Sequence, residues 1–252
     1  MAVLNNLDYT GATISSGVLT DNGVNYTIKV NGGGIGPSLL TDPLAIGLPS
    51  IRDKVQAGTP AGETHDRSER EIAHVDLDRV YHFGGTRYVP YAVPRYPFDD
   101  PDWCSLIQVW QATPVLKSPP IMVGIRLLSG VKYLELRAGN DATGQVRLWK
   151  TSMELPGDDS LLNHPWDFVL RFKFSLTAAQ VQLFLHPWGG TVISSPLFTS
   201  PIGYGDALFN YVQLKTGVYR GPRVALPGQA STWWVDSARD KLGDYYSEVK
   251  PW

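Results

Sequence analysis

The sequence predicts an all-β protein, a two-sheet antiparallel β-sandwich of the jelly-roll type. Short runs that alternate apolar and polar residues, rich in β-branched and aromatic side chains, recur along the chain and indicate strands. Glycine (25 residues) and proline (19 residues) are frequent, as expected for many short strands joined by turns. Helical periodicity is scarce. Strands of this length and spacing favour two packed sheets.

The alternating runs place the expected strands, in chain order, at 24–30, 50–55, 67–76, 87–96, 105–111, 121–128, 133–138, 146–151, 166–174, 180–185, 211–220 and 232–236. Turn-forming residues separate them at Gly84-Gly85, Asp99-Asp100-Pro101, Pro119-Pro120, Gly139-Asn140, Pro156-Gly157-Asp158 and Gly189-Gly190. Short helical turns are expected only at 175–180 and 237–242. Residues 1–46, rich in glycine and asparagine, are predicted to form either edge strands or a loosely attached arm.

Composition limits the possible classes of protein. The 252 residues are close to the roughly 200–250 that sandwiches and barrels reach as one domain, so a single domain over residues 1–252 is expected. Apolar residues make up 43% of the chain and charged residues 18%, which argues against disorder. The formal net charge of −2 provides no overall attraction for nucleic acid, so an acidic partner must be bound by a local basic patch. A single cysteine, Cys104, excludes an intramolecular disulfide.

The N-terminus lacks both the basic segment and the long apolar segment of a signal peptide. No apolar run approaches the roughly 20 residues of a membrane-spanning helix, so no membrane contact is expected. The histidines at positions 74, 82, 164 and 186 have no metal-ligand spacing. No cofactor is therefore predicted, and nothing in the sequence indicates calcium.

The most informative segment is the predicted strand at 211–219. Strand alternation places one polar and aromatic set of side chains on a single face and an apolar set on the other. The polar set comprises Tyr211, Gln213, Lys215, Gly217 and Tyr219. The simpler alternative is an ordinary half-exposed strand.

Two other strands carry comparable polar faces. The first presents His65, Arg67, Glu69 and Glu71 on one side, a pattern also typical of a solvated edge. The second presents Gln108 and Trp110 on one side, with Ile107 and Val109 turned toward the core. A glutamine in an apolar strand is more often a satisfied neighbour than a catalytic group.

In chain order, these three strands resemble the Arg-Ser-Glu-Leu, Gln-Ile-His and Tyr-Phe-Lys-Ala-Gly-x-Tyr signatures of jelly-roll polysaccharide lyases, the group that includes alginate, glucuronan and heparin-lyase-like enzymes. The segments 166–175, 181–189, 215–221 and 233–236 resemble further strands of that group, so the resemblance covers roughly residues 51–236. It implies a concanavalin A-like fold, a monomer, an acidic polysaccharide as partner and an extracellular or secreted location.

The resemblance also implies the chemistry of β-elimination at a uronic acid. Arg67 and Gln108 would neutralise the carboxylate next to the C5 proton, and Tyr219 would serve as base and then as acid. The pKa of Tyr219 is expected to be lowered by neighbouring Lys215, Arg67 or Arg220. The remaining contacts with the substrate are assigned to Lys215, Tyr211, Gln213, Glu69, Trp110 and Arg220.

Two departures from the lyase pattern stand out. Trp110 occupies the position where the group often has a catalytic histidine, so His65 becomes the substitute candidate, with an exposed loop-end histidine as the alternative. Arg70 replaces the leucine of Arg-Ser-Glu-Leu and brings a charge to an expected core position, which questions the strand register.

Two other functions compete with the lyase. A glycoside hydrolase on this type of sandwich would need paired carboxylates in a motif such as Glu-x-Asp-x-x-Glu, which is absent from the sequence. A non-catalytic carbohydrate-binding module, lectin-like or from a viral surface, would keep the binding face and lose the chemistry. The presence of Arg67, Gln108, Lys215 and Tyr219 together favours the lyase.

Overall fold

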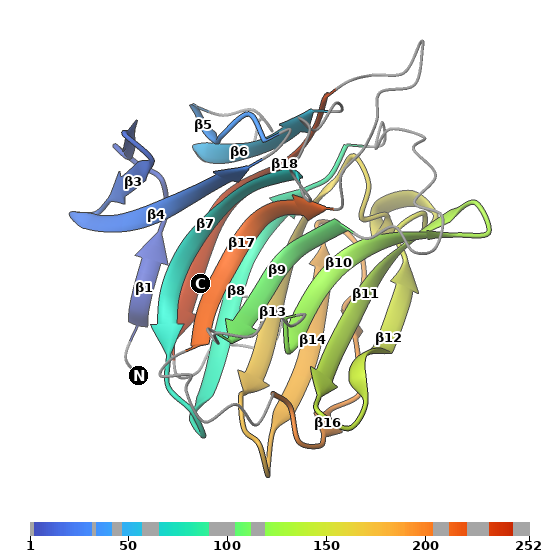
Figure 1. Ribbon diagram of the computed structural model, residues 1–252. Helices are drawn as coiled ribbons and strands as arrows, with labels where there is room; N and C mark the ends of the chain where they lie inside the picture. Colours follow the sequence, from blue (N-terminus) through green and yellow to red (C-terminus); the bar gives the residue numbers. More distant parts are fainter. Residues whose placement is uncertain are drawn as a thin grey trace.

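A computed structural model of the chain shows a β-sandwich of two antiparallel sheets that face each other across an apolar core (Figure 1). The structure describes residues 3–31, 34–41, 47–56, 66–90, 104–111, 119–203, 212–220 and 232–243. The predicted all-β sandwich is confirmed.

The sheet at the front of Figure 1 contains the three strands singled out from the sequence. Its order is β12 (Gly144–Ser152), β11 (Val131–Asn140), β10 (Ile121–Leu128), β9 (Cys104–Gln111), β17 (Val212–Arg220), β7 (Asp66–Val75), β4 (Val24–Asn31), β3 (Val18–Asp21) and β2 (Thr13–Ser15). Strands β9, β17 and β7 are therefore direct neighbours at its centre, although they lie far apart in the sequence.

The second sheet lies behind the first. Its order is β15 (Ile193–Ser194), β14 (Gln180–Pro187), β13 (Pro165–Lys173), β8 (Val80–Tyr88), β18 (Thr232–Gly243), β6 (Ser50–Gln56) and β5 (Ser38–Leu40), with β1 (Val3–Leu7) paired to β18 and β16 (Phe198–Thr199) paired to β14. The segment before Gly47 thus contributes strands β1 to β5 to the two sheets. Among the described residues, no helix has the length and apolar character needed to cross a membrane.

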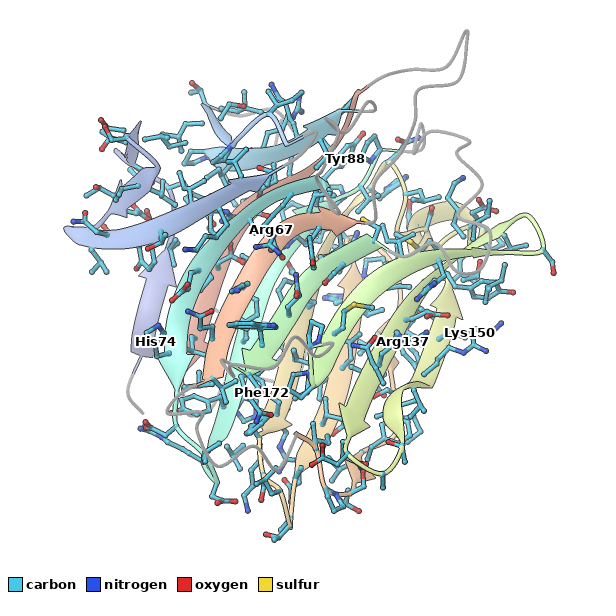
Figure 2. All side chains as sticks on the ribbon, viewed as in Figure 1. Arg67, His74, Tyr88, Arg137, Lys150 and Phe172 are labelled. Carbon is cyan, nitrogen blue, oxygen red and sulfur yellow. The ribbon has the colours of Figure 1, made fainter. Side chains whose placement is uncertain are left out.

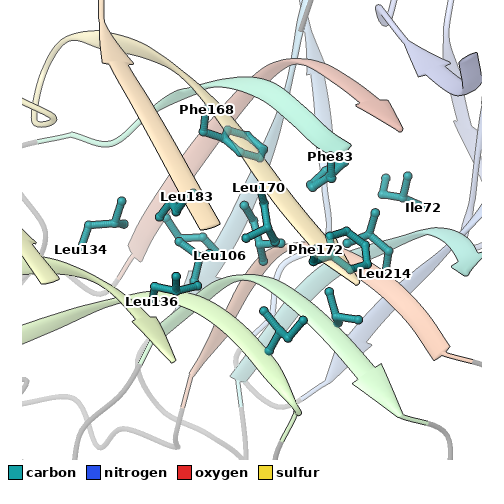
Figure 3. Packing of buried hydrophobic residues seen from close by; sticks show 14 of the residues in the cluster. Ile72, Phe83, Leu106, Leu134, Leu136, Phe168, Leu170, Phe172, Leu183 and Leu214 are labelled. Atoms are coloured by element: carbon teal, nitrogen blue, oxygen red, sulfur yellow. The ribbon is translucent and has the colours of Figure 1, made fainter. Parts of the chain in front are cut away.

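The core forms where the inward faces of the sheets meet (Figure 3). Leu214 and Val218 of β17 are fully buried, as strand alternation predicts. Phe83 and Phe168 of the second sheet pack edge to face, with ring centroids 5.3 Å apart. This packing turns the other face of β17, with Lys215 and Tyr219, away from the core.

The charge of Arg70 does not disturb the register of β7, because buried carboxylates compensate it inside the sandwich. The Arg70 guanidinium is fully buried and donates to Asp53 Oδ2 at 2.8 Å and to Asp240 Oδ2 at 3.0 Å. Arg87 donates to the other oxygen of Asp240 at 2.6 Å, and Tyr9 donates its hydroxyl hydrogen to Asp240 as well. These residues form a buried ionic network that joins the front sheet to the second sheet.

Three local predictions were wrong. Gly84 and Gly85 do not form a turn but lie inside β8, where a Cβ on Gly85 would stand 2.4 Å from the carbonyl oxygen of Arg239, so glycine permits the close approach of β18. Residues 237–242 are not helical, since β18 continues to Gly243 and alternates buried and partly exposed side chains from Ala238 to Leu242. Residues 176–178 form bends between a β-bridge at Ser175 and the start of β14 at Gln180. Tertiary pairing overrode local propensity in these segments.

The predictions of a strand at 87–96 and of a turn at 156–158 agree only in part with the structure. Of the expected strand 87–96, residues 87 and 88 end β8, and residues 91–103 lie outside the described residues. The turn at 156–158 is instead the start of a short 3₁₀ helix, η1 (Gly157–Asp159).

Candidate functional site

Strand pairing brings four sequence-predicted residues onto one face of the front sheet. Tyr219 of β17 lies opposite Arg67 of β7, and Lys215 of β17 lies opposite Gln108 of β9. The residue between them on β17 is Gly217, paired with Glu69. We call Arg67, Glu69, Gln108, Lys215 and Tyr219 the central cluster.

Gly217 has a left-handed φ of 140°, and a Cβ there would lie 2.3 Å from the carbonyl oxygen of Ser68. A side chain at this position would push β7 and β17 apart. Glycine therefore holds the two strands of the central cluster together.

Arg67 contacts both tyrosine and carboxylate. Its guanidinium carbon lies 4.3 Å from the centroid of the Tyr219 ring, and the guanidinium is hydrogen-bonded to the phenol. Its Nε lies 3.3 Å from Glu69 Oε2. The Arg67 side chain is 22% exposed, and Figure 2 shows it on the front sheet. A ligand on this face can therefore reach Arg67.

Glu69 is completely buried beneath this face. Its Oε1 accepts a short hydrogen bond from Gln108 Nε2. Burial raises the pKa of the Glu69 carboxyl to about 7, against the opposing influence of Arg67, Lys215 and the Gln108 hydrogen bond. The sequence assigned Glu69 to substrate contact, and the structure corrects this: a fully buried carboxylate can only position Arg67 and Gln108.

Lys215 pairs with an aromatic ring as well as with charge. Its Nζ lies 4.2 Å from the centroid of Trp110, the residue at the position of the lyase histidine. Burial lowers the pKa of Lys215, and the nearby Glu69 carboxylate opposes this shift. Trp110 and Gln213, which face each other on β9 and β17, are each partly exposed.

The expected pKa shift of Tyr219 was wrong in direction. Burial raises the pKa of the phenol above its usual value of 10.0, and it outweighs the hydrogen bond and positive charge of Arg67, which lower it. The sequence indicated the cations near Tyr219, which lower its pKa, but not the burial of the phenol, which raises it. Tyr219 is thus protonated in the free protein at neutral pH.

The remaining predicted residues fall outside what the structure describes. His65 and Tyr211 lie outside the described residues, and Arg220 belongs to β17 but its side chain is not described. Gln108 is only 2% exposed and Lys215 only 7%, so a ligand meets Arg67, Tyr219 and Trp110 before it meets either of them.

Within the described ranges, no group of three His, Cys, Asp or Glu side chains is arranged to hold a metal ion.

No family model and no curated protein matches the sequence. Solved structures do match. An endo-β-1,4-glucuronan lyase from Trichoderma reesei aligns with a TM-score of 0.66, covering 99% of both chains at 12% identity. The chain has a concanavalin A-like jelly-roll fold.

Two other solved structures share this fold with different activities. The catalytic domain of a glycoside hydrolase family 131 protein from Coprinopsis cinerea aligns with a TM-score of 0.58, at 10% identity over 89% of this chain and 85% of that one. An alginate lyase from Pseudomonas aeruginosa aligns with a TM-score of 0.50, at 11% identity over 78% and 83%. At these identities the similarity establishes the fold, and the activity must be argued from the site.

Proposed function

We propose that this protein binds an acidic polysaccharide on the front sheet and cleaves it by β-elimination at a uronic acid. The observation that carries the proposal is the central cluster, in which Arg67 stacks on the Tyr219 ring and lies 3.3 Å from the buried Glu69, which accepts a hydrogen bond from Gln108. The fold shared with a glucuronan lyase and an alginate lyase supports it.

The first chemical requirement is to neutralise the uronate carboxylate, because its charge makes the adjacent C5 proton only weakly acidic. In the proposed complex, Arg67 presents donors to the carboxylate. Gln108 has one N–H engaged with Glu69 and its second N–H free of that bond. Glu69 acts as a positioning residue that holds both donors in place as negative charge grows on the carboxylate.

The second requirement is to move two protons. Tyr219 would remove the C5 proton as phenolate and return a proton to the departing O4 oxygen as phenol, on the same face of the sugar. Since the pKa of Tyr219 is raised, the phenol is ready as the acid, while the base is the minor phenolate form.

The direct test is absorbance of unsaturated uronate ends during incubation with alginate, glucuronan, heparinoid and ulvan-type polymers. We expect absorbance to rise with at least one of them. New reducing ends without unsaturation would contradict elimination and indicate hydrolysis instead. A protein that binds these polymers but cleaves none would be a binding module.

A non-catalytic carbohydrate-binding module is the second candidate, and specific features favour it. Trp110 replaces the expected histidine, Gln108 is almost completely buried, and the pKa of Tyr219 is raised rather than lowered. The partly exposed rings of Trp110 and Tyr219 lie next to cations, an arrangement that suits the stacking of sugars on a surface. The two candidates predict the same binding and differ only in the appearance of unsaturated ends.

We expect affinity for acidic polymer to increase as the pH falls from about 8 to about 6, because the Glu69 carboxyl, whose pKa is about 7, then gains a proton. Protonation removes one negative charge between Arg67 and Lys215, so the cluster becomes more positive while the polymer stays ionised. Titration calorimetry at both pH values measures this. Glu69→Gln is the matched variant and should bind with a flatter pH dependence, whereas a flat profile in the wild type would contradict the assignment.

A further inference from the structure

A second group of cations lies on the outer face of the front sheet, at β10, β11 and β12. These three strands carry five cationic residues and one acidic residue. On the outer face lie Arg126, Arg137, Arg147 and Lys150 with Glu135, whereas Lys132 alternates with Glu135 and shares the side of Leu134 and Leu136. Lys132 pairs with Glu154 at 2.9 Å, just beyond β12. The other four cations have a single described carboxylate among them on these strands.

That carboxylate is a buried centre around which the arginines converge. Glu135 is fully buried, and its oxygens lie 2.9 Å from Arg147 Nη1, 3.1 Å from Arg137 Nη1 and 3.6 Å from Arg126 Nε. Arg137 and Arg147 share this one carboxylate among the described residues, so the two guanidinium groups leave an excess of one positive charge. The Arg147 side chain is 42% exposed and that of Arg137 is 19% exposed, so this excess is accessible to a ligand.

Lys150 extends the positive surface toward the edge of the sheet. It is exposed, it lies opposite Glu135 on β12, and its Nζ stands 3.9 Å from the centroid of the Tyr133 ring. Figure 2 shows Arg137 and Lys150 near this edge and Arg67 closer to the middle of the same sheet. We call Arg126, Glu135, Arg137, Arg147 and Lys150 the arginine cluster.

Strand register places the two clusters on one line across the sheet. Glu135 pairs with Gly124, Gly124 with Ser105, Ser105 with Tyr219, and Tyr219 with Arg67. Three strand spacings of about 4.8 Å separate Glu135 from Tyr219, or about 14 Å in all. An extended chain that crosses the strands along this line would therefore meet both clusters.

The two positions between the clusters carry no side chain or only a small one. Gly124 contributes no side chain, and a Cβ there would lie 2.4 Å from the carbonyl oxygen of Cys104, so only glycine fits the approach of β9. Ser105 contributes only a hydroxyl, which donates to the carbonyl of Ile107. No large side chain rises from these two positions to block a chain lying across them.

We propose that the arginine cluster is a second anion-binding subsite, which takes a carboxylate of the same acidic polymer several sugars away from the one at Arg67. This inference rests on the proposed function for the identity of the polymer. The buried Glu135 holds the guanidinium groups in fixed positions, so little side-chain entropy is lost on binding. The substrate is accordingly a polymer with repeated anionic groups, and both subsites fill only when it is long enough.

The experiment measures affinity against oligomer length without turnover. In a Tyr219→Phe background, calorimetry with oligoglucuronates and oligoguluronates of increasing length should show a steep gain in affinity once the oligomer spans both clusters. The variant Arg137→Gln with Arg147→Gln should lose that gain, by roughly tenfold or more, and bind short oligomers as before. The salt dependence of binding to long oligomers should also weaken.

Controls separate a subsite from a general loss of charge or of fold. Arg171→Gln, on β13 of the second sheet, removes a partly exposed arginine and should leave the length dependence intact. Arg147→Gln alone removes the most exposed member of the arginine cluster and should show part of the effect even if the double variant does not fold. Equal affinities for long oligomers in the parent and in both variants, or no binding of either oligomer series by the parent, would overturn the subsite.

The outcomes for the subsite and for the lyase are distinguishable. Length-dependent binding that requires Arg137 and Arg147, in a wild type that forms no unsaturated ends, supports the subsite and rejects the elimination. Unsaturated ends with no effect of the arginine variants on length dependence support the elimination and reject the subsite.

Discussion

Tyr219→Phe is expected to reduce the formation of unsaturated uronate ends by a factor of about 100 to 10,000 in kcat, the usual contribution of a positioned acid or base. The substitution deletes only the phenolic oxygen and keeps the ring beneath the Arg67 guanidinium. Affinity for the polymer should therefore stay nearly unchanged. Initial rates of absorbance change, compared with calorimetric binding, separate the two effects.

Arg67→Ala is the informative companion. It removes a donor that would hold the substrate carboxylate in the ground state and in the transition state alike, so both affinity and kcat should fall. A Tyr219→Phe protein that still forms unsaturated ends at nearly the wild-type rate would reject Tyr219 as the proton-transfer residue.

The pH dependence of the rate gives a separate check on Tyr219. Its pKa is raised above 10.0, so the phenolate fraction, and with it kcat, should rise about tenfold per pH unit from about pH 7 to about pH 9. Over the same range, ionisation of Glu69 should weaken binding and raise KM. A KM that rises through about pH 7 and then levels off, while kcat continues to rise to about pH 9, would identify the two groups separately, and a kcat that does not change with pH would contradict the phenolate.

Trp110→His tests the departure at the usual histidine position. If an imidazole contributes here, the activity should rise or the pH optimum should move toward the titration of histidine near about 6.5. The substitution also removes the ring beneath Lys215 Nζ, so Trp110→Phe is the matched control for lost aromatic contact.

Strand alternation was sufficient to predict the face on which the central cluster lies, because a side-chain period of two is local to each strand. It was not sufficient to predict burial. Glu69 and Gln108 were expected to face a ligand, but they lie on β7 and β9, which flank β17 at the centre of the sheet, and both are almost completely buried. The direction of the Tyr219 pKa shift was wrong for the same reason.

The sequence contains a pattern that points to the arginine cluster. Glu135-x-Arg137 repeats, at the same strand spacing, the pairing of Arg67 with Glu69. Arg147 reaches the same face only because the register between β11 and β12 shifts after Leu136, and such a shift cannot be found without the pairing itself. Bulges in this sheet therefore limit how far site residues can be inferred from alternation.

Asp240→Asn is expected to lower the free energy of unfolding by about 3–5 kcal/mol, the usual cost of removing one partner from a buried ion pair. Asp240 is fully buried and accepts hydrogen bonds from Arg70 and Arg87, which come from opposite sheets. Without its charge, Arg70 would keep Asp53, whereas Arg87 would lose the carboxylate with which it pairs among the described residues. Urea denaturation followed by tryptophan fluorescence measures the change.

A surface pair provides the matched control for this prediction. Lys132 and Glu154 form a partly exposed ion pair, and Glu154→Gln should change stability by at most about 1 kcal/mol. Joint replacement of Arg70 and Asp53 by apolar residues of similar volume should cost less than Asp240→Asn, because the pair of Arg87 and Asp240 stays balanced. Equal losses in the buried and the surface variants would contradict the network.

The buried ionic network also bears on the site above it. Arg87 donates to Thr216 Oγ1 at 2.7 Å, and Thr216 lies on β17 between Lys215 and Gly217. Loosening of Arg87 in Asp240→Asn should therefore disturb the register of β17 against β7 and β9, on which the pairing of Tyr219 with Arg67 depends. We expect the folded Asp240→Asn protein to bind acidic polymer more weakly at temperatures well below its unfolding transition, and unchanged binding there would show that the network stabilises the fold without positioning the site.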